Sequence, residues 1–258
     1  MTDSSPQSPL AESLIPTEPG PGQGTLEQGL AGTYPLSLSE VVKEAWGRVA
    51  GNKGALWIGA AIYIAVHFVI ALVLGLFLGG DAPVPTPDAG VQISTPGENL
   101  AEILATVLTL PLGVGLMFLG VAVASGRQAI PTSLFSWYDR FLKLALTWIL
   151  MTIMVLIGTL LLVLPGIYLA VSYQLALPLV ADKGLGPWEA LETSRKTVTH
   201  KWFTFFGLGL VGGLAATGSV LLLGIPLIWV LPTCLIGIGI MYRNAIGVEA
   251  STLDRVSN

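Results

Sequence analysis

Charged side chains are scarce in this sequence, and their scarcity excludes an ordinary soluble domain. Only 11% of the 258 residues are charged and 53% are hydrophobic, whereas soluble domains are about 25% charged. One domain of this length cannot bury so much apolar sequence, because its surface-to-volume ratio limits the buried fraction. A lipid bilayer must therefore cover much of the chain. The net charge of −4 gives no indication of a nucleic-acid partner.

Groups that carry out chemistry are equally rare. Cys234 is the only cysteine, so an intrachain disulfide is excluded. The two histidines, His67 and His200, belong to no H-E-x-x-H pattern, and no C-x-x-C pattern exists. Ser125 and His200 do not suggest the Ser/His pair of a protease, and the glycines at 207–213 lack the Lys-Ser or Lys-Thr of a phosphate loop. We expect no metal, no cofactor and no catalytic residue.

The first 36 residues lack Lys and Arg and are rich in Pro, Gly, Ser and Glu. A secretory signal needs a basic start followed at once by an apolar stretch, so this segment is not one. With few apolar side chains it cannot offset the entropy lost on ordering. We predict a disordered tail over residues 1–36.

Six apolar segments follow, and each approaches the roughly 20 residues that a helix needs to cross the ~30 Å hydrocarbon core. Pro165-Gly166 and Gly224-Ile225-Pro226 separate long segments from short ones and predict tight helical hairpins. Reading each such pair as one kinked helix would require nearly 40 apolar residues, about twice the length of a span. The fold predicted is an all-α, polytopic membrane bundle of six transmembrane helices in three hairpins. The segments are 55–79, 100–124, 141–164, 166–181, 202–223 and 225–242.

The positions of the basic residues predict the orientation. With six spans, all 12 Lys and Arg fall on one side, and basic residues remain cytoplasmic during insertion. The opposite side receives the loop 80–99, which contains Asp81, Asp88 and Glu98 and no cation. Five or seven spans would scatter the basic residues over both faces. We therefore predict a membrane domain over 37–246 and a cytoplasmic tail over 247–258.

Three cytoplasmic stretches, 37–52, 131–140 and 187–200, are predicted to form amphipathic helices at the membrane surface. Ser37 with Glu40 makes a capping box for the first, and Pro187 suits the first position of the third. Each stretch precedes a two-helix hairpin, which suggests three copies of one unit; chance identity in apolar sequence is the alternative. Aromatic and basic side chains at these surfaces are candidate lipid contacts: Lys43, Trp46, Arg48, Trp188, Arg195, Lys196 and Trp202.

A recurrent signature occupies the second half of the chain. It comprises Leu164-Pro165-Gly166-Ile167-Tyr168-Leu169-Ala170, then Tyr173, the run 177–182 and the run 186–194. It resembles the YciC-like bacterial inner-membrane proteins and the membrane domain attached to some glycerophosphodiester phosphodiesterases, in which a PG turn, an ADxxLGPxEALxxS linker and an amphipathic helix recur in this order. The first half is similar only in architecture. The resemblance implies a helical fold and a bacterial inner membrane, and it implies no activity. Combined with the orientation predicted from the basic residues, it places both termini in the cytoplasm and loop 80–99 in the periplasm as an expectation.

A few polar residues lie inside predicted spans. His67 is halfway along the first, where an ionisable group is costly and often functional; a neutral imidazole bonded to a neighbouring helix is the favoured interpretation, because no carboxylate was identified inside a span. Ser172, Tyr173 and Gln174 either bond across helices, which we favour, or line a cavity. Gly75/Gly79 and Gly209/Gly213 have the spacing of close helix contacts, favoured within one chain over a dimer.

Two functional hypotheses remain. The first is a non-enzymatic protein that acts by interaction with the lipid bilayer and other membrane proteins, in scaffolding, assembly or envelope homeostasis. The second is a small-solute or lipid transporter or channel, supported by the apparent repeat, Pro111 and Pro232 within spans, and the polar cluster. An intramembrane enzyme is the least favoured. A continuous polar cavity reaching Gln174 or His67 would favour transport, and a solid bundle would favour interaction.

Overall fold

The computed structural model describes residues 23–79 and 95–257, and the regular structure within these ranges is helical. Six stretches are long and apolar enough to cross a membrane, which confirms a multi-pass, all-helical chain: Lys53–Leu78, Pro96–Ala124, Pro131–Leu161, Val163–Lys183, Trp202–Leu221 and Leu227–Ala245. The helices are α2 (Leu26–Ala31), α3 (Leu38–Val49), α4 (Lys53–Leu78), α5 (Pro96–Ala124), η1 (Pro131–Arg140), α6 (Phe141–Leu161), α7 (Val163–Ser172), α8 (Ala176–Lys183), α9 (Pro187–His200), α10 (Trp202–Leu221), α11 (Leu227–Ala245) and α12 (Ala250–Ser257).

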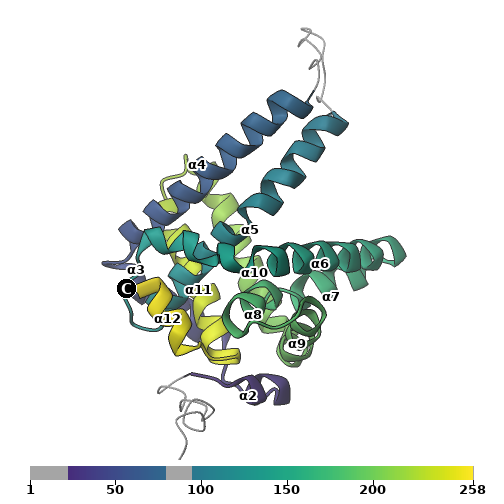
Figure 1. Ribbon diagram of the computed structural model, residues 1–258. Helices are drawn as coiled ribbons and strands as arrows, with labels where there is room; N and C mark the ends of the chain where they lie inside the picture. The colour runs from purple at the N-terminus through teal and green to yellow at the C-terminus, as the bar shows by residue number, and fades with distance from the viewer. Residues whose placement is uncertain (1–22, 80–94, 258) are drawn as a thin grey trace, which may run out of the picture.

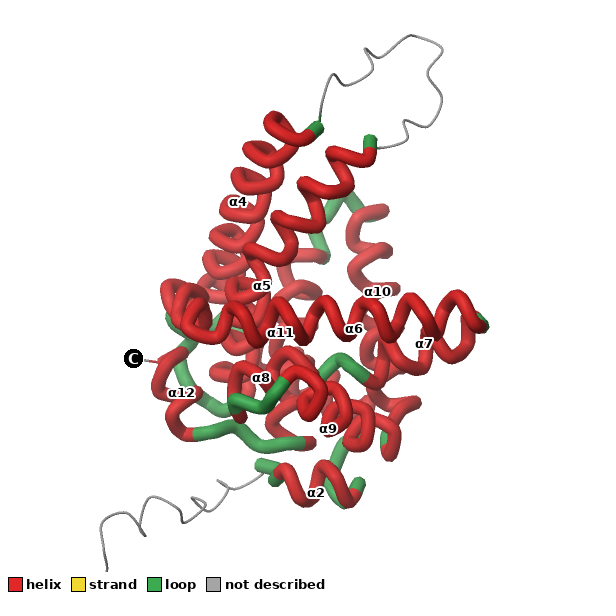
Figure 2. Tube along the Cα trace, turned by 45° about the vertical axis from the view of Figure 1, so that its right-hand side comes forward, coloured by secondary structure: helices red, strands yellow, loops and turns green. Residues whose placement is uncertain are grey.

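The long helices are arranged in pairs. We name α4 with α5 the first pair, α6 with α7 the second pair and α10 with α11 the third pair. The members of each pair pack against each other, and α5 also packs against α11. The second pair runs across the direction of the first pair in both views (Figures 1 and 2). The three pairs extend from a common base, which we define as α2, α3, η1, α8, α9, α12 and the last turns of α5 and α11.

The turns within the pairs follow from local sequence, with one shift from expectation. In the third pair the helix ends at Leu221 and Gly224 takes φ +76°, a left-handed conformation that suits glycine. In the second pair the break falls at Leu162, three residues before Pro165. Pro165 instead occupies the first turn of α7, where a missing N–H leaves no helical hydrogen bond unmade.

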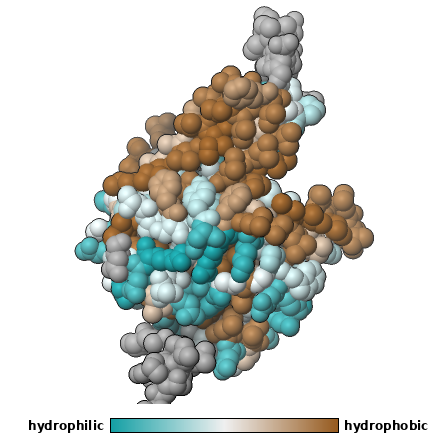
Figure 3. Space-filling model, in the orientation of Figure 1, coloured by the Kyte–Doolittle hydropathy of each residue, from teal (hydrophilic) through white to brown (hydrophobic). Residues whose placement is uncertain are grey.

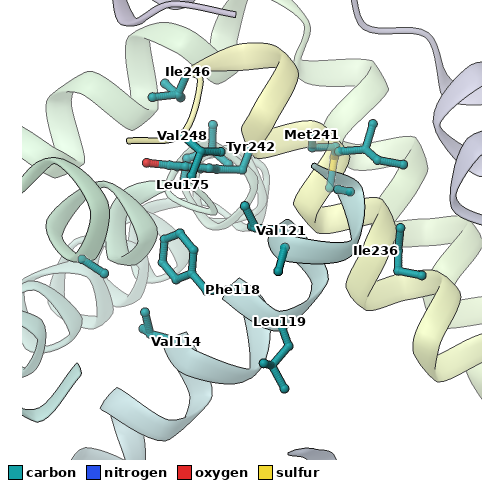
Figure 4. Close-up of a cluster of buried hydrophobic side chains, with 14 of the residues drawn as sticks. Val114, Phe118, Leu119, Val121, Leu175, Ile236, Met241, Tyr242, Ile246 and Val248 are labelled. Carbon is teal, nitrogen blue, oxygen red and sulfur yellow. The ribbon is translucent and has the colours of Figure 1, made fainter. Parts of the chain in front are cut away.

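Large aromatic side chains fill the core where α5 meets η1 and α11. The ring of Phe118 stacks on Trp137, with centroids 4.6 Å apart, and meets Tyr242 edge-on at 5.8 Å. All three residues are fully buried. Figure 4 shows Phe118 and Tyr242 converging with Val121 from α5 and Leu175 from the α7–α8 junction. The folded core therefore lies where the C-terminal halves of α5 and α11 meet η1.

Glycines allow the closest approach between helices at a place that the spacing did not predict. A methyl group on Gly120 of α5 would overlap the carbonyl of Leu235 in α11, and one on Gly239 would overlap the backbone at Gly120. By contrast, nothing lies within 4 Å of such a group on Gly75 or Gly213. The other members of the two predicted pairs do have neighbours: a methyl group on Gly79 would lie 3.6 Å from Glu98 of α5, and one on Gly209 would lie 3.9 Å from Gln174. The predicted close contacts within the chain are therefore present at Gly79 and Gly209 and absent among the described residues at Gly75 and Gly213.

Apolar side chains cover the helix pairs, and polar ones gather over the base (Figure 3). In the most apolar 18-residue stretch of α4 no residue is buried, and the buried shares are 11% in α10 and 22% in the Pro131–Leu161 span. In water such a surface would be strongly unfavourable, at about 25 cal/mol per Å². The pairs therefore present their apolar faces outward.

The last part of the segment predicted to be disordered is ordered. Thr25 and Gln28 form a capping box that starts α2, and Gly32 ends the helix with φ +72°. Tyr34 is buried, and its hydroxyl donates to the carbonyl of Thr197, 2.8 Å away. One buried aromatic and a capped helix thus order residues 25–36; residues 1–22, like most of loop 80–99, lie outside the described part of the chain.

Candidate functional site

His67 has a carboxylate partner that the sequence analysis overlooked. Its Nε2 lies 3.1 Å from Oε1 of Glu102 in α5, and its Nδ1 lies 3.0 Å from Oγ1 of Thr109. The Tyr63 ring stacks on the imidazole with centroids 5.9 Å apart. Glu102 stands near the start of a segment that was treated as uniformly apolar. The premise that no carboxylate accompanies His67 is therefore wrong, and the bond to a neighbouring helix is confirmed.

A cavity of about 170 Å³ lies beside this cluster. Its wall includes Tyr63, Thr106 and Thr109 of the first pair and Gln174 from the junction of α7 and α8. A water molecule takes about 30 Å³ in the liquid, so roughly five would fill the space. Gln174 and the His67 cluster, which are far apart in sequence, thus approach one cavity.

The three residues of the polar run 172–174 lie in different environments. Ser172 is buried. Tyr173 is buried and packs with Ala176 and Leu191, whereas Gln174 is exposed toward the cavity. The helix is interrupted at this run, between α7 and α8. Ser194 of α9 bridges the two backbone groups that flank this interruption. Its hydroxyl donates to the carbonyl of Ser172 at 2.7 Å and accepts from the amide of Leu175 at 3.1 Å.

An ionic network at the base joins α3, α5 and α11. Arg243 donates to both carboxylate oxygens of Glu44, at 3.0 and 3.1 Å, and Arg48 donates to one of them at 2.9 Å. The same arginines donate to the last carbonyls of α5, Arg48 to Val123 at 3.1 Å and Arg243 to Ala124. Burial alone would raise the pKa of Glu44, but the hydrogen bond and charge of Arg243, with those of Arg48, hold that pKa below its usual value.

A second buried polar cluster surrounds Asp182, whose side chain has no exposed surface. Its Oδ2 accepts from the hydroxyl of Tyr242 at 2.7 Å, and its Oδ1 accepts from the amide of Glu249 at 3.1 Å. Lys183 lies 3.5 Å from the same carboxylate and 2.5 Å from Oε1 of Glu249. Asp182 therefore connects the end of α8 to α11 and to the segment before α12, a role in assembly of the base.

The candidate interfacial residues separate into exposed and structural ones. Trp46 and Trp188 are exposed, by 58% and 63% of their surface, and Lys43 lines a shallow groove along α3 with Leu38, Val42 and Trp46. The indole of Trp202, in contrast, stacks on Phe206 and donates to the carbonyl of Tyr168 at 3.3 Å. Arg48 belongs to the ionic network described above.

The middle interfacial stretch differs most from expectation. Residues 131–140 form a 3₁₀ helix, and Leu134 and Trp137 of its apolar stripe are fully buried in the core. Arg140, the last residue of this helix, donates to the carbonyls of Val180 and Ala181 in the last turn of α8. This stretch therefore packs on protein through its stripe, while Phe135 and Tyr138 remain exposed.

The exposed charges of α9 form their own cluster. Arg195 contacts Glu192 at 2.8 and 3.0 Å, and Lys196 lies 3.4 Å from the same carboxylate. The hydrogen bond from Arg195 is the main cause that lowers the pKa of Glu192, and Lys196 adds to it. The cluster presents both signs of charge to the solvent.

Comparison with known proteins adds no assignment: no family model, no curated protein and no solved structure matches the chain. The resemblance of the second half to the YciC-like proteins therefore stays a prediction. Its linker residues now have structural positions, since Asp182 is the buried carboxylate of the base and Ser194 closes the α7–α8 interruption. In the described part of the chain, no three His, Cys, Asp or Glu side chains are grouped to hold a metal ion.

Proposed function

We propose that the chain is a non-enzymatic, multi-pass protein of a bacterial inner membrane that acts by interaction, with both termini in the cytoplasm. The observation that carries the proposal is the contrast between its two parts. The base is a packed core whose helices are joined by hydrogen bonds and ion pairs. The helix pairs diverge from this base, and their apolar faces are exposed (Figures 1 and 3). Open apolar faces are suited to lipid and to other membrane helices.

The base supplies the cytoplasmic surface of this scaffold. Helix α3 turns Val41, Ala45 and Val49 inward and leaves Leu38, Val42 and Trp46 exposed beside Lys43. An exposed row of apolar side chains with a tryptophan and a lysine fits the headgroup zone of an anionic bilayer. We assign α3 as the main interfacial helix, and the charged cluster on α9 as the surface that selects a partner.

Exchange of one ion pair tests this assignment. In the double variant Glu192→Arg, Arg195→Glu, the net charge and the pair within the helix are kept, and such pairs are worth only about 0.2–0.5 kcal/mol. Stability should therefore change little, while a partner that reads the charge pattern should be lost. The measurement is rescue of a strain that lacks the chain, with each variant expressed at normal level. Full rescue by the exchanged pair would count against the proposal.

Transport is the second candidate, favoured by the cavity between Gln174 and the His67 cluster. Under the interaction proposal, His67→Phe and Gln174→Leu remove only interhelical contacts, worth about 0.6–2 kcal/mol where a hydrogen bond is lost in lipid. Both variants should then unfold slightly earlier and still rescue the strain. Loss of rescue by Gln174→Leu with an unchanged unfolding temperature would replace interaction by transport.

A further inference from the structure

The turn that joins α10 to α11 is apolar on every side. From Val220 to Ile228 it contains no polar side chain. Leu221 is 80% exposed and Leu223 is 91% exposed. A turn that emerged into water would leave these side chains hydrated, at a cost of about 1.5–3 kcal/mol each. The segment that joins the first pair differs, since it contains Asp81, Asp88 and Glu98.

The backbone of this turn is also suited to an apolar medium. The amide of Gly224 donates to Ser219 at 2.8 Å, and the amide of Leu227 donates to Gly224 at 3.0 Å. The amides of Leu222, Ile225, Ile228, Trp229 and Val230 likewise donate to carbonyls within the turn. Pro226 has no amide to satisfy. Backbone groups exposed to lipid must be bonded internally, and this turn meets most of that requirement without water.

Contacts with α4 give the height of the turn relative to the first pair. The indole of Trp57 donates to the carbonyl of Ile228 at 3.1 Å, and the ammonium group of Lys53 lies 5.6 Å from the centroid of the Trp229 ring. Helix α4 begins at Lys53, at the end that is predicted to face the cytoplasm. Beyond Trp57, α4 continues to Leu78, roughly 30 Å further at 1.5 Å per residue. The first pair therefore extends about one bilayer core beyond the level of this turn.

We infer that the third pair is a re-entrant hairpin: it enters from the cytoplasmic side, and its turn, Val220–Ile228, ends among the acyl chains of the cytoplasmic leaflet without reaching the far surface. Its partner is the hydrocarbon of that leaflet. The inference rests on the orientation given with the proposed function, and not on the interaction role. The basic residues are compatible with it, because a hairpin that turns back inside the bilayer returns its flanks to the same side as one that crosses twice.

Cysteine accessibility in the full chain tests the inference. In a Cys234→Ala background, single cysteines replace Leu223 in the turn, Thr86 in the acidic segment between α4 and α5, and Lys196 on exposed α9. Intact cells and inverted membrane vesicles are treated with a membrane-impermeant maleimide. We expect Thr86→Cys to react only from outside and Lys196→Cys only in inverted vesicles. Leu223→Cys should react in neither preparation, and should react fully once detergent removes the bilayer.

Depth is then measured directly. A fluorophore on Leu223→Cys should be quenched more by lipids that carry a nitroxide high in the acyl chain, close to the headgroup, than by lipids labelled at the methyl end of the chain. Val220→Cys, one turn earlier, gives a second probe if the first variant folds poorly. Labelling of either cysteine from outside, to the extent seen at Thr86→Cys, would overturn the inference, and so would labelling from the cytoplasmic side.

Discussion

Removal of the Ser194 hydroxyl is the sharpest test of how the base holds the membrane helices. Ser194→Ala deletes one oxygen atom, yet two backbone groups lose their partner at once: the carbonyl of Ser172 and the amide of Leu175. Ser194, Ser172 and Leu175 are all buried, so water does not replace the lost bonds. A buried polar group left without a partner costs about 1–3 kcal/mol, which gives roughly 2–6 kcal/mol for the two.

Thr193→Ala is the matched control, since Thr193 precedes Ser194 on the same helix and is only partly buried. Both substitutions improve helix propensity by a similar amount, about 0.5 kcal/mol. In mild detergent, we expect Ser194→Ala to lower the unfolding temperature by several degrees, since about 2–4 °C corresponds to 1 kcal/mol at this chain length. Equal unfolding temperatures for the two variants would show that the Ser194 hydroxyl does not stabilise the backbone between α7 and α8.

Two further predictions concern the base and the helix crossing. Glu44→Gln should destabilise the protein at neutral pH by about 1.5–3 kcal/mol, because Arg243 loses a charged partner. Since the pKa of Glu44 is held below its usual 4.5, its contribution is present above that pH and is lost as the pH falls through the lowered pKa. The unfolding temperatures of Glu44→Gln and the wild type, measured against pH, should therefore converge in acid. At neutral pH, Glu27→Gln at an exposed position should leave the unfolding temperature nearly unchanged. Gly120→Ala should destabilise by about 1–3 kcal/mol, because its methyl group meets the backbone of α11, while Gly213→Ala should be neutral or stabilising; equal unfolding temperatures for these two variants would exclude the crossing at Gly120.

The helices of this chain were predictable because their signals are local. Apolar length predicted six candidate spans, and six lie within the described residues; five have ends within a few residues of the prediction, and the third begins ten residues earlier, at Pro131. Turn residues were less informative: Pro165-Gly166 marked the second turn, but the helix breaks at Leu162. A proline is tolerated in the first turn of a helix, so its position alone does not distinguish the end of one helix from the start of the next.

The candidate site was less predictable because it depends on distant contacts. Glu102 meets His67 from 35 positions away, and Asp182 meets Tyr242 from 60 positions away. Glu102 is a visible charge in an apolar segment and could have been found by inspection. Nothing local indicates that Ser194 closes an interruption 20 residues upstream, or that Trp137 enters the core rather than the membrane surface.

The basic residues at the ends of α5 and α8 make structural contacts in addition to their predicted part in orientation. Arg48 and Arg243 bind the last carbonyls of α5, Arg140 binds those of α8, and Lys143 donates to the carbonyl of Gly184 at 3.0 Å. Each cation meets the negative end of a helix dipole, where a positive charge is stabilising. The charges that predict the orientation therefore also join helix ends to one another: Arg48 of α3 and Arg243 of α11 meet at the end of α5, and Arg140 of η1 and Lys143 of α6 meet at the end of α8.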